Sequence, residues 1–293
     1  MRNVVDRRLL QNQNFEVFLF GSEVKESLSP MIHNTLFKEL GLNAEYSLYE
    51  VKSEKAFLSA VLKIRNKSVL GFNITAPFKQ TILSNLDSID GKARAVGAVN
   101  TVKLDRAGVL SGYNTDFEGV LASLTKLRVR KGSAMILGAG GAARACVYAL
   151  AQRELQSITI LNRTLETAQE LATSFSKKFP KCEILAHPLP DHLTVDCDLL
   201  INAISDTAFQ RGFPMKIQYQ EGKTKVLDLG YKMRSIVLDG AKRAGLKNMD
   251  GFEMLVEQAA KSFEIWTGIR PGARMIELAA RSALRESKRK RGK

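Results

Sequence analysis

The chain has 293 residues, a formal net charge of +14 and a hydrophobic content of 45%. This length allows two domains with separate cores, and the composition is ordinary for a soluble globular protein. No apolar run approaches the roughly 20 residues that span a bilayer, and the cysteines are too few and too scattered for a disulfide framework or a metal site, at Cys146, Cys182 and Cys197. We therefore expect a cytoplasmic protein with no membrane partner.

Part of the positive charge lies at the C-terminus, where residues 285–293 include six basic residues and one acidic residue. The other basic residues are dispersed, without aromatic interleaving or a groove-reading motif. We interpret this tail as a frayed, solvated end and expect no nucleic-acid partner. A basic surface also favours anionic small molecules, because it raises their local concentration.

Strand and helix patterns alternate in the first part of the chain. Strands are predicted at 15–20, 46–51 and 69–74, and helices at 30–40, 54–65 and 78–86. A turn at 105–108 predicts a β-hairpin between strands 99–104 and 109–112. The alternation indicates an α/β domain with a mostly parallel sheet, which we assign to residues 1–115.

A second α/β series is assigned to residues 116–250. Helices are predicted at 117–127 and 142–152, and strands at 134–137, 157–161, 183–186, 199–202 and 226–229. Residues 251–293 predict two closing helices, 252–266 and 273–285. We expect these helices to return to the first domain.

The sequence GFNITAPFK, residues 71–79, joins a predicted strand to a predicted helix. Thr75 is the predicted N-cap and Pro77 lies in the predicted first turn, which places Lys79 near the positive end of the helix dipole. Open α/β sheets bind ligands at such strand ends. Taken alone, Lys79 is more often a solvated surface lysine than a group poised to exchange a proton.

A glycine-rich turn, GAGGAA at residues 138–143, stands between a predicted strand and a predicted helix. That context is typical of a dinucleotide site. Gly138 allows the tight turn, Gly140 lets the backbone approach a pyrophosphate, and Ala143 permits close packing of helix on strand. The N-terminus of the helix then offers free N–H groups to phosphate.

The residues after the next strand bear on the choice of cofactor. NAD sites usually hold the ribose with an acidic residue about 20 positions after the glycines. Here the strand ends in Asn162, Arg163 and Thr164, and the Arg163 guanidinium suits a 2′-phosphate. We therefore favour NADP, although Glu166 is close enough to leave NAD open.

Further polar residues stand next to predicted helices or strands. Ser29 and Asp116 have an ordinary explanation at helix N-termini, and Gln258 has one as a surface residue. Ser27 has no such explanation, and Asn100 stands at the start of a predicted strand. Each residue alone is weak evidence for a site.

Taken in order, these segments resemble the shikimate dehydrogenase family over residues 18–284. The motifs that carry the resemblance are SLSPMIHN, GFNITAPFK, GAVNT, NTDFEG, GAGGAARA, NRT and GFEMLVEQAA. The resemblance implies an NADP-dependent oxidoreductase of aromatic amino-acid biosynthesis that interconverts shikimate and 3-dehydroshikimate. It also implies a substrate domain followed by a Rossmann-type domain.

The resemblance implies a role for each matching residue. Lys79 and Asp116 would be the catalytic pair. The substrate would be bound by Ser27, Ser29, Asn73, Thr75, Asn100, Tyr231 and Gln258. NADP would be held by Gly138, Ala139, Gly140, Gly141, Ala142, Asn162, Arg163, Thr164 and Gly251. No metal is implied.

Two residues depart from the family pattern: Met233 replaces a frequent proline, and Ile204 replaces a small polar residue. The resemblance implies that both residues affect the geometry of the site where the nicotinamide would bind. An NAD-dependent quinate/shikimate dehydrogenase is the nearest alternative, although Ser27 and Ser29 favour shikimate. A catalytically inactive metabolite-sensing or nucleic-acid-binding protein is a further alternative. The sequence leaves open whether the protein is a monomer or a homodimer.

Overall fold

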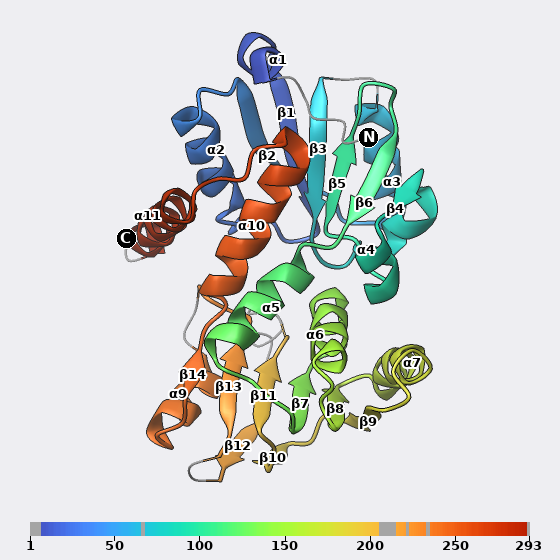
Figure 1. The fold of residues 1–293 in the computed structure, drawn as a ribbon, viewed down its shortest axis with the longest axis vertical. Helices are drawn as coiled ribbons and strands as arrows, with labels where there is room; N and C mark the ends of the chain where they lie inside the picture. Colours follow the sequence, from blue (N-terminus) through green and yellow to red (C-terminus); the bar gives the residue numbers. More distant parts are fainter. Residues whose placement is uncertain (1–6, 66–67, 205–214, 221–222, 233–234, 292–293) are drawn as a thin grey trace. The chain divides into compact units, whose positions relative to one another are not determined.

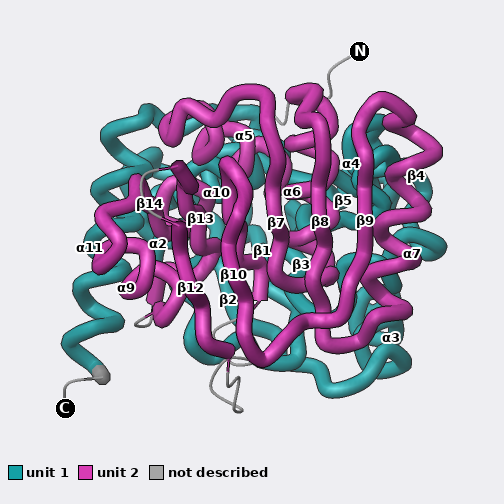
Figure 2. The backbone as a smooth tube through the Cα atoms, turned by 90° about the horizontal axis from the view of Figure 1, so that it is seen from below, with its two compact units in different colours: residues 1–115, 255–293 teal, residues 116–254 magenta. Residues whose placement is uncertain are grey.

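A computed structural model describes residues 7–65, 68–204, 215–220, 223–232 and 235–291. The chain forms two compact units. The first contains residues 1–115 and 255–293, and the second contains residues 116–254 (Figure 2). An α/β architecture is thus observed in two parts, and the closing helices belong with the N-terminal residues.

The first unit is built on a six-stranded sheet in the order β2-β1-β3-β5-β6-β4 (Figure 1). The strands are β1 (Phe15–Gly21), β2 (Ala44–Glu50), β3 (Val69–Ile74), β4 (Ser88–Ile89), β5 (Thr101–Leu104) and β6 (Leu110–Tyr113). β5 is antiparallel to both β3 and β6, and the other pairings are parallel. The predicted hairpin explains this reversal, because β5 and β6 are joined by a tight turn in which the Asp105 carboxylate accepts the N–H groups of Ala107 and Val109.

The helices of the first unit follow the alternation of strands. They are α1 (Arg7–Asn12), α2 (Ser29–Glu39), α3 (Glu54–Ile64), α4 (Gly91–Val96), most of α10 (Phe252–Thr267), and α11 (Ala273–Arg291). In α3, the hydroxyl of Ser53 caps the helix by accepting the N–H of Ala56. The apolar stripe of α3, including Phe57 and Val61, packs into the core with Phe72 of β3.

The predicted helix at 78–86 was wrong. Residues 76–80 form turns, and only Thr81–Asn85 form a short 3₁₀ helix, η1. Phe78 and Ile82 are buried in the core, so a helix-like apolar spacing arises from packing beneath a turn. Thr75 is therefore not a helix N-cap, and the helix-dipole argument does not apply to Lys79.

The C-terminal tail also differs from the prediction. It is helical, because α11 continues to Arg291 and packs against α2. An ion pair of 2.9 Å between Lys290 and Glu286, one turn apart, supports this last part of the helix. Residues 292–293 lie outside the described part of the chain.

The second unit contains a six-stranded sheet in the order β14-β13-β11-β7-β8-β9, in which every pairing is parallel. The strands are β7 (Ser133–Leu137), β8 (Ser157–Asn162), β9 (Glu183–Pro188), β11 (Leu199–Asn202), β13 (Lys225–Asp228) and β14 (Asn248–Met249). A parallel pair forms a second small sheet, β10 (His192–Val195) and β12 (Lys216–Tyr219). From β7 the sheet is extended on one side by β8 and β9, and the chain then returns to add β11, β13 and β14 on the other side of β7. The strand order therefore reverses between β7 and β11. Such a reversal is where doubly wound sheets bind their ligands.

The second unit contains helices α5 (Asp116–Lys126), α6 (Gly141–Gln152), α7 (Leu165–Ser176) and α9 (Ile236–Arg243). Helices α5 and α6 were predicted from the sequence, and α7 and α9 were not. Both follow ordinary rules: α7 buries Ala168, Leu171 and Phe175 along one face, and the Ser235 hydroxyl caps α9.

Candidate active site

The loops that follow β1 and β3 leave the same edge of the first sheet. The N–H of Thr75 donates to the carbonyl of Phe20 over 2.8 Å, and the N–H of Ser22 donates to the carbonyl of Ala76 over 3.2 Å. Because β1 and β3 are parallel neighbours, these bonds join the segments that carry several predicted site residues. The edge is therefore a structured polar surface at the carboxyl ends of strands.

Two residues predicted to bind the substrate, Ser27 and Ser29, lie just before and at the start of α2. The hydroxyl of Ser27 accepts the N–H of Ser29 over 3.2 Å, and both residues are half-buried. Ser29 is the first helical residue, and Leu28 takes the cap position with no side-chain cap bond. The alternative explanation of Ser29 as an N-cap therefore does not apply. The start of this helix offers N–H groups and hydroxyls suited to an anion.

Lys79 lies in the turn after β3 and is half-buried. Its backbone carbonyl accepts the N–H of Val99 over 2.8 Å. This bond ties the turn to the segment that leads into Asn100 and β5. The position of Lys79 is thus fixed by a turn and a cross-link, where the sequence predicted a helix.

Two predicted amides, Asn73 and Asn100, are buried together, with exposures of 6% and 3%. The Nδ2 of Asn73 donates to the carbonyl of Asn100 over 3.0 Å. The Oδ1 of Asn100 accepts the backbone N–H of Thr115 over 2.7 Å. These bonds connect β3, the entry to β5 and the segment that precedes α5.

Four residues that contact these amides were not predicted from the sequence: Tyr46, Thr101, Thr115 and Ser262. Thr101 and Thr115 stand within motifs that were noticed, GAVNT and NTDFEG. Ser262 had one weak signal: it lies four residues after Gln258 on α10, and residues four apart share a helix face. Gln258 is half-buried, and its amide donates to the carbonyl of Leu255 over 3.2 Å.

Asp116 is the first residue of α5 and is buried, with 5% exposure. It follows Thr115 directly, at the boundary where the second unit begins. Lys79 belongs to the first unit and Asp116 to the second, so their catalytic pairing stays a prediction.

The glycine turn of the second unit lies where β7 meets α6. Gly138 has a positive φ of 100° and donates its N–H to the carbonyl of Leu161 over 2.8 Å. Gly140 is the N-cap of α6 and is exposed, and a Cβ there would meet no atom within 4 Å. The backbone is therefore open to a ligand at the N-terminus of α6. Residues Ala139, Gly141 and Ala142 complete the turn and the first helical residues.

The residues at the end of β8 and after it form a turn at the surface. Arg163 and Thr164 are exposed, and the Asn162 amide donates to the carbonyl of Thr164 over 2.9 Å. β8 is the parallel neighbour of β7, so this turn leaves the same edge of the sheet as Gly138. An exposed guanidinium at this edge can contact a phosphate.

A buried carboxylate organises the end of β13. Asp228 accepts the amide of Asn202 over 3.0 Å, the N–H of Gly230 over 2.8 Å, and the hydroxyl of Ser235. Tyr231 follows this turn and is half-buried. A Cβ at Gly251 would collide with the backbone carbonyl of Leu229. Close packing thus accounts for the glycine at 251.

Of the two residues that depart from the family pattern, Ile204 and Met233, only Ile204 is described by the structure. Ile204 follows β11, and its side chain would lie 3.2 Å from a Cβ placed at Gly138. It therefore borders the glycine turn. Met233 lies outside the described residues.

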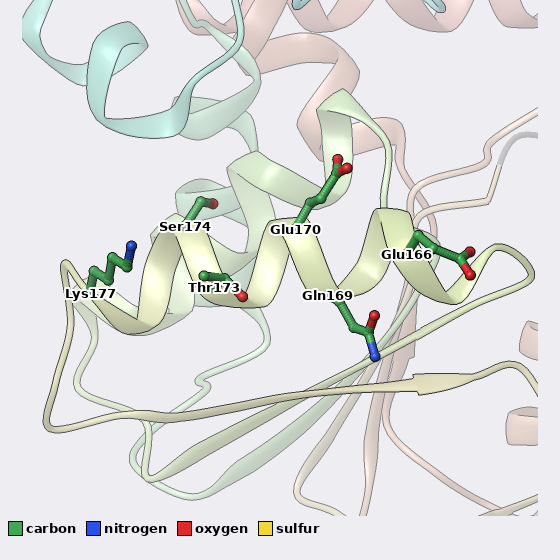
Figure 3. Close-up of a pocket in the computed structure, with 6 residues that line it drawn as sticks. All are labelled: Glu166, Gln169, Glu170, Thr173, Ser174 and Lys177. Atoms are coloured by element: carbon green, nitrogen blue, oxygen red, sulfur yellow. The ribbon is translucent and has the colours of Figure 1, made fainter.

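A shallow hollow of about 490 Å³ lies along one face of α7 (Figure 3). The six residues that line it all belong to α7 or its C-terminal cap: Glu166, Gln169, Glu170, Thr173, Ser174 and Lys177. None of them is a predicted site residue. Side chains from a single helix do not converge on a ligand, so we assign this hollow no function.

Within the described residues, no group of three or more His, Cys, Asp or Glu side chains could hold a metal ion. In the same part of the chain, no helix is both long enough and apolar enough to cross a membrane.

A parallel doubly wound sheet with a glycine turn at its switch point is typical of dinucleotide-binding enzymes, among them the nicotinamide-dependent oxidoreductases. Comparison with known proteins identifies the family. Residues 19–102 match the shikimate dehydrogenase substrate binding domain, residues 121–212 match the shikimate/quinate 5-dehydrogenase family, and residues 251–274 match the shikimate 5′-dehydrogenase C-terminal domain. The chain belongs to the shikimate dehydrogenase family.

Individual relatives agree over nearly the whole chain. The shikimate dehydrogenase (NADP(+)) of Caldanaerobacter subterraneus subsp. tengcongensis is 37% identical, over 85% of this chain and 90% of that protein. A crystal structure of a shikimate dehydrogenase in complex with NADP+ is 31% identical, with a TM-score of 0.81, and covers 94% of this chain and 97% of its own. A structure from Thermus thermophilus in complex with NADP(H) and shikimate is 32% identical, with a TM-score of 0.75, and covers 92% and 100% of the two chains.

Proposed function

We propose that this protein is a shikimate dehydrogenase that interconverts shikimate and 3-dehydroshikimate with NADP(H). The observation that carries the proposal is the polar edge of the first sheet, where the turn that holds Lys79 is hydrogen-bonded to Val99, the residue before the buried Asn100. The relatives named above, which are NADP-dependent or bind NADP and shikimate, support the same substrate and cofactor.

The proton transfer is assigned to Lys79 and Asp116. Oxidation of a secondary alcohol removes a hydride from carbon and a proton from the hydroxyl, and ketone reduction returns both. A lysine near that hydroxyl can accept and return the proton, and such acid–base help typically contributes about 10²–10⁴ in rate. Asp116, an acidic residue buried at the start of α5, is proposed to stabilise the charge that forms on the lysine.

The substrate is proposed to be held by polar side chains that match its carboxylate and hydroxyl groups. They are Ser27, Ser29, Asn73, Thr75, Asn100, Tyr231 and Gln258. A site built from amides and hydroxyls disfavours ligands that lack the matching groups, because its own polar atoms would then be buried without partners.

The residues of the second unit fit a dinucleotide. The open backbone at Gly140 and the N-terminus of α6 suit the pyrophosphate, and the exposed Arg163 suits the 2′-phosphate of NADP. Bound NADP supplies the hydride acceptor for alcohol oxidation. The proposed contacts also include Ala139, Gly141, Ala142, Asn162, Thr164 and Gly251.

Glu166 supports an alternative in which the enzyme uses NAD, and it does not bear on the choice between shikimate and quinate. It is an exposed carboxylate in the first turn of α7, three residues after Arg163. A carboxylate near the ribose repels a 2′-phosphate and can accept hydrogen bonds from the ribose hydroxyls of NAD. The choice between the two cofactors is therefore an experimental question of relative rates.

The protein is proposed to act in the cytoplasm as a monomer or a homodimer. In the described structure its three cysteines are free and buried, which agrees with a reducing compartment. Light scattering at several protein concentrations would determine the oligomeric state.

The assignment of Lys79 is tested by shikimate oxidation in the variant Lys79→Ala. We expect kcat to fall by at least about 10², while NADP binding measured by calorimetry stays within about twofold, because the substitution removes a proton carrier outside the nucleotide-binding unit. The matched control is Lys55→Ala, at an exposed lysine of α3. Unchanged turnover in Lys79→Ala would refute the role of Lys79.

A further inference from the structure

The side-chain amide of Asn73 is held on several sides by hydrogen bonds within the first unit. Its Nδ2 lies 3.0 Å from the carbonyl of Asn100, 2.9 Å from the hydroxyl of Thr101 and 3.2 Å from the hydroxyl of Ser262. Its Oδ1 accepts the hydroxyl of Tyr46 over 2.8 Å. All of these contacts are buried, so water cannot readily replace them.

The chemistry of the partners fixes which way the amide faces. The backbone carbonyl of Asn100 can only accept a hydrogen bond, so the atom opposite must be the Nδ2 of Asn73. The two N–H hydrogens of that nitrogen are then shared among three internal acceptors. The oxygen accepts one bond from Tyr46 and has a second lone pair.

The two hydroxyls that contact the nitrogen of this amide, those of Thr101 and Ser262, form a cluster with the hydroxyl of Thr115. Thr101 and Ser262 are 2.8 Å apart, Thr115 and Ser262 are 3.1 Å apart, and Thr101 and Thr115 are 3.2 Å apart. All three residues are at most 1% exposed. They join β5, α10 and the segment before α5, so the amide is fixed by elements far apart in the sequence (Figure 1).

Tyr46, on the oxygen side, is itself fixed through α2. The Asn34 amide exchanges two bonds with the Tyr46 backbone, of 2.7 Å and 3.0 Å. The His33 ring stacks on the Tyr46 ring, with centroids 4.7 Å apart and an interplanar angle of 11°. Adjacent residues of one helix thus hold the tyrosine by its backbone and by its ring.

We propose that Tyr46, Thr101 and Ser262 are positioning residues that hold the Asn73 amide so that its Oδ1 accepts a hydrogen bond from a hydroxyl of the substrate. This inference rests on the proposed function, because it requires Asn73 to contact the substrate. It gives Asn73 a defined selectivity: the residue recognises a hydrogen-bond donor and disfavours a carbonyl or carboxylate oxygen at the same place.

The variant Tyr46→Phe tests the proposal by removing one hydroxyl while keeping the ring that stacks on His33. Without its bond from Tyr46, the Asn73 oxygen is less well oriented, and we expect the KM for shikimate to rise by about three- to tenfold, the equivalent of one hydrogen bond. We expect kcat and the KM for NADP+ to change less than about twofold. The matched control is Tyr49→Phe, on the same strand, at a residue with 38% exposure.

Substrate analogues that each lack one ring hydroxyl distinguish a role of Tyr46 in positioning Asn73 from a merely structural role. If Tyr46 acts through Asn73, the affinity difference between wild type and Tyr46→Phe should vanish for the analogue that lacks the hydroxyl bound by Asn73, and persist for the others. An equal penalty with every analogue, or no penalty with shikimate, would overturn the proposal. Wild-type protein without shikimate oxidation would instead refute the proposed function, so the two failures are distinct.

If Tyr46→Phe unfolds, Thr101→Val tests the same amide from its nitrogen side. It removes one acceptor of the Asn73 nitrogen and preserves the shape of the side chain. The same dependence on one substrate hydroxyl is expected, and its absence in a folded variant would likewise overturn the proposal.

Discussion

The indole Nε1 of Trp266 donates a hydrogen bond to the backbone carbonyl of Val102 over 2.9 Å, and both groups are buried. The bond ties α10 to β5, although the two residues are 164 positions apart. Gly71 makes this approach possible, because a Cβ there would collide with the Val102 carbonyl and the indole. A glycine in β3 therefore allows the C-terminal helix to join the N-terminal sheet.

Gly71→Ala should destabilise the protein by about 2 kcal/mol or more, since the added methyl group meets backbone and a buried ring. Chemical denaturation followed by Trp266 fluorescence measures this, because Trp266 is the single tryptophan of the chain. Gly91→Ala is the matched control, with no atom within 4 Å of the new Cβ. Equal stability of the two variants would show that α10 does not depend on the glycine.

His33 should make the protein sensitive to acid. Burial lowers its pKa from 6.5 to about 3, so between these values the unfolded chain binds a proton that the folded protein does not. The free energy of unfolding is therefore highest above pH 6.5. As the pH decreases from 6.5 towards 3, it falls by about 1.4 kcal/mol per pH unit.

The variant His33→Phe keeps an aromatic ring and removes two nitrogens that have no hydrogen-bond partner among the described residues. The free energy of unfolding, measured from pH 4 to pH 7, should depend less on pH in this variant by up to about that slope. The exposed His187, replaced by Gln, is the control. Parallel curves for wild type and His33→Phe would contradict a neutral buried imidazole.

Gly140→Ala separates a nucleotide site from a simple packing turn. The residue has a negative φ of −80°, and a Cβ there meets no protein atom, so the fold should tolerate the change within about 1 kcal/mol. The methyl group would stand where a pyrophosphate approaches the backbone. We expect the Kd for NADP+ to rise about tenfold or more, and an unchanged Kd would argue against a nucleotide at this turn.

Arg163→Ala should weaken the use of NADP+ more than that of NAD+. Loss of a charge-assisted contact to the 2′-phosphate should lower kcat/KM for NADP+ by about 10- to 100-fold. The value for NAD+ should change less, because NAD+ has no such phosphate. Steady-state kinetics with both cofactors measures the difference, with the exposed Arg130 replaced by Ala as the control. An equal loss with both cofactors would show that Arg163 does not read the phosphate.

The sequence predicted the parts of the fold that local patterns specify. Gly138 and its flanking strand and helix were predicted because tight turns impose their own residue types. The predicted helix at 78–86 was wrong because Phe78 and Ile82, although spaced like one helix face, enter the core from a turn at 76–80 and from the short 3₁₀ helix that follows it. Local spacing does not distinguish these two arrangements.

The missed residues of the site depend on long-range contacts. Ser262 lies 189 positions from Asn73, and no local pattern marks a buried serine as a partner of a distant amide. Tyr46 was predicted as part of a strand, but its hydroxyl bond to Asn73 depends on how β2, β1 and β3 align in the sheet. Tertiary structure was needed to find both.

The most direct test of the proposed activity is the steady-state oxidation of shikimate and of quinate, each with NADP+ and with NAD+, by the purified protein. We predict the highest kcat/KM for shikimate with NADP+. A higher value for quinate with NAD+, or no oxidation in any of the four combinations, would contradict the proposal that this chain is an NADP-dependent shikimate dehydrogenase.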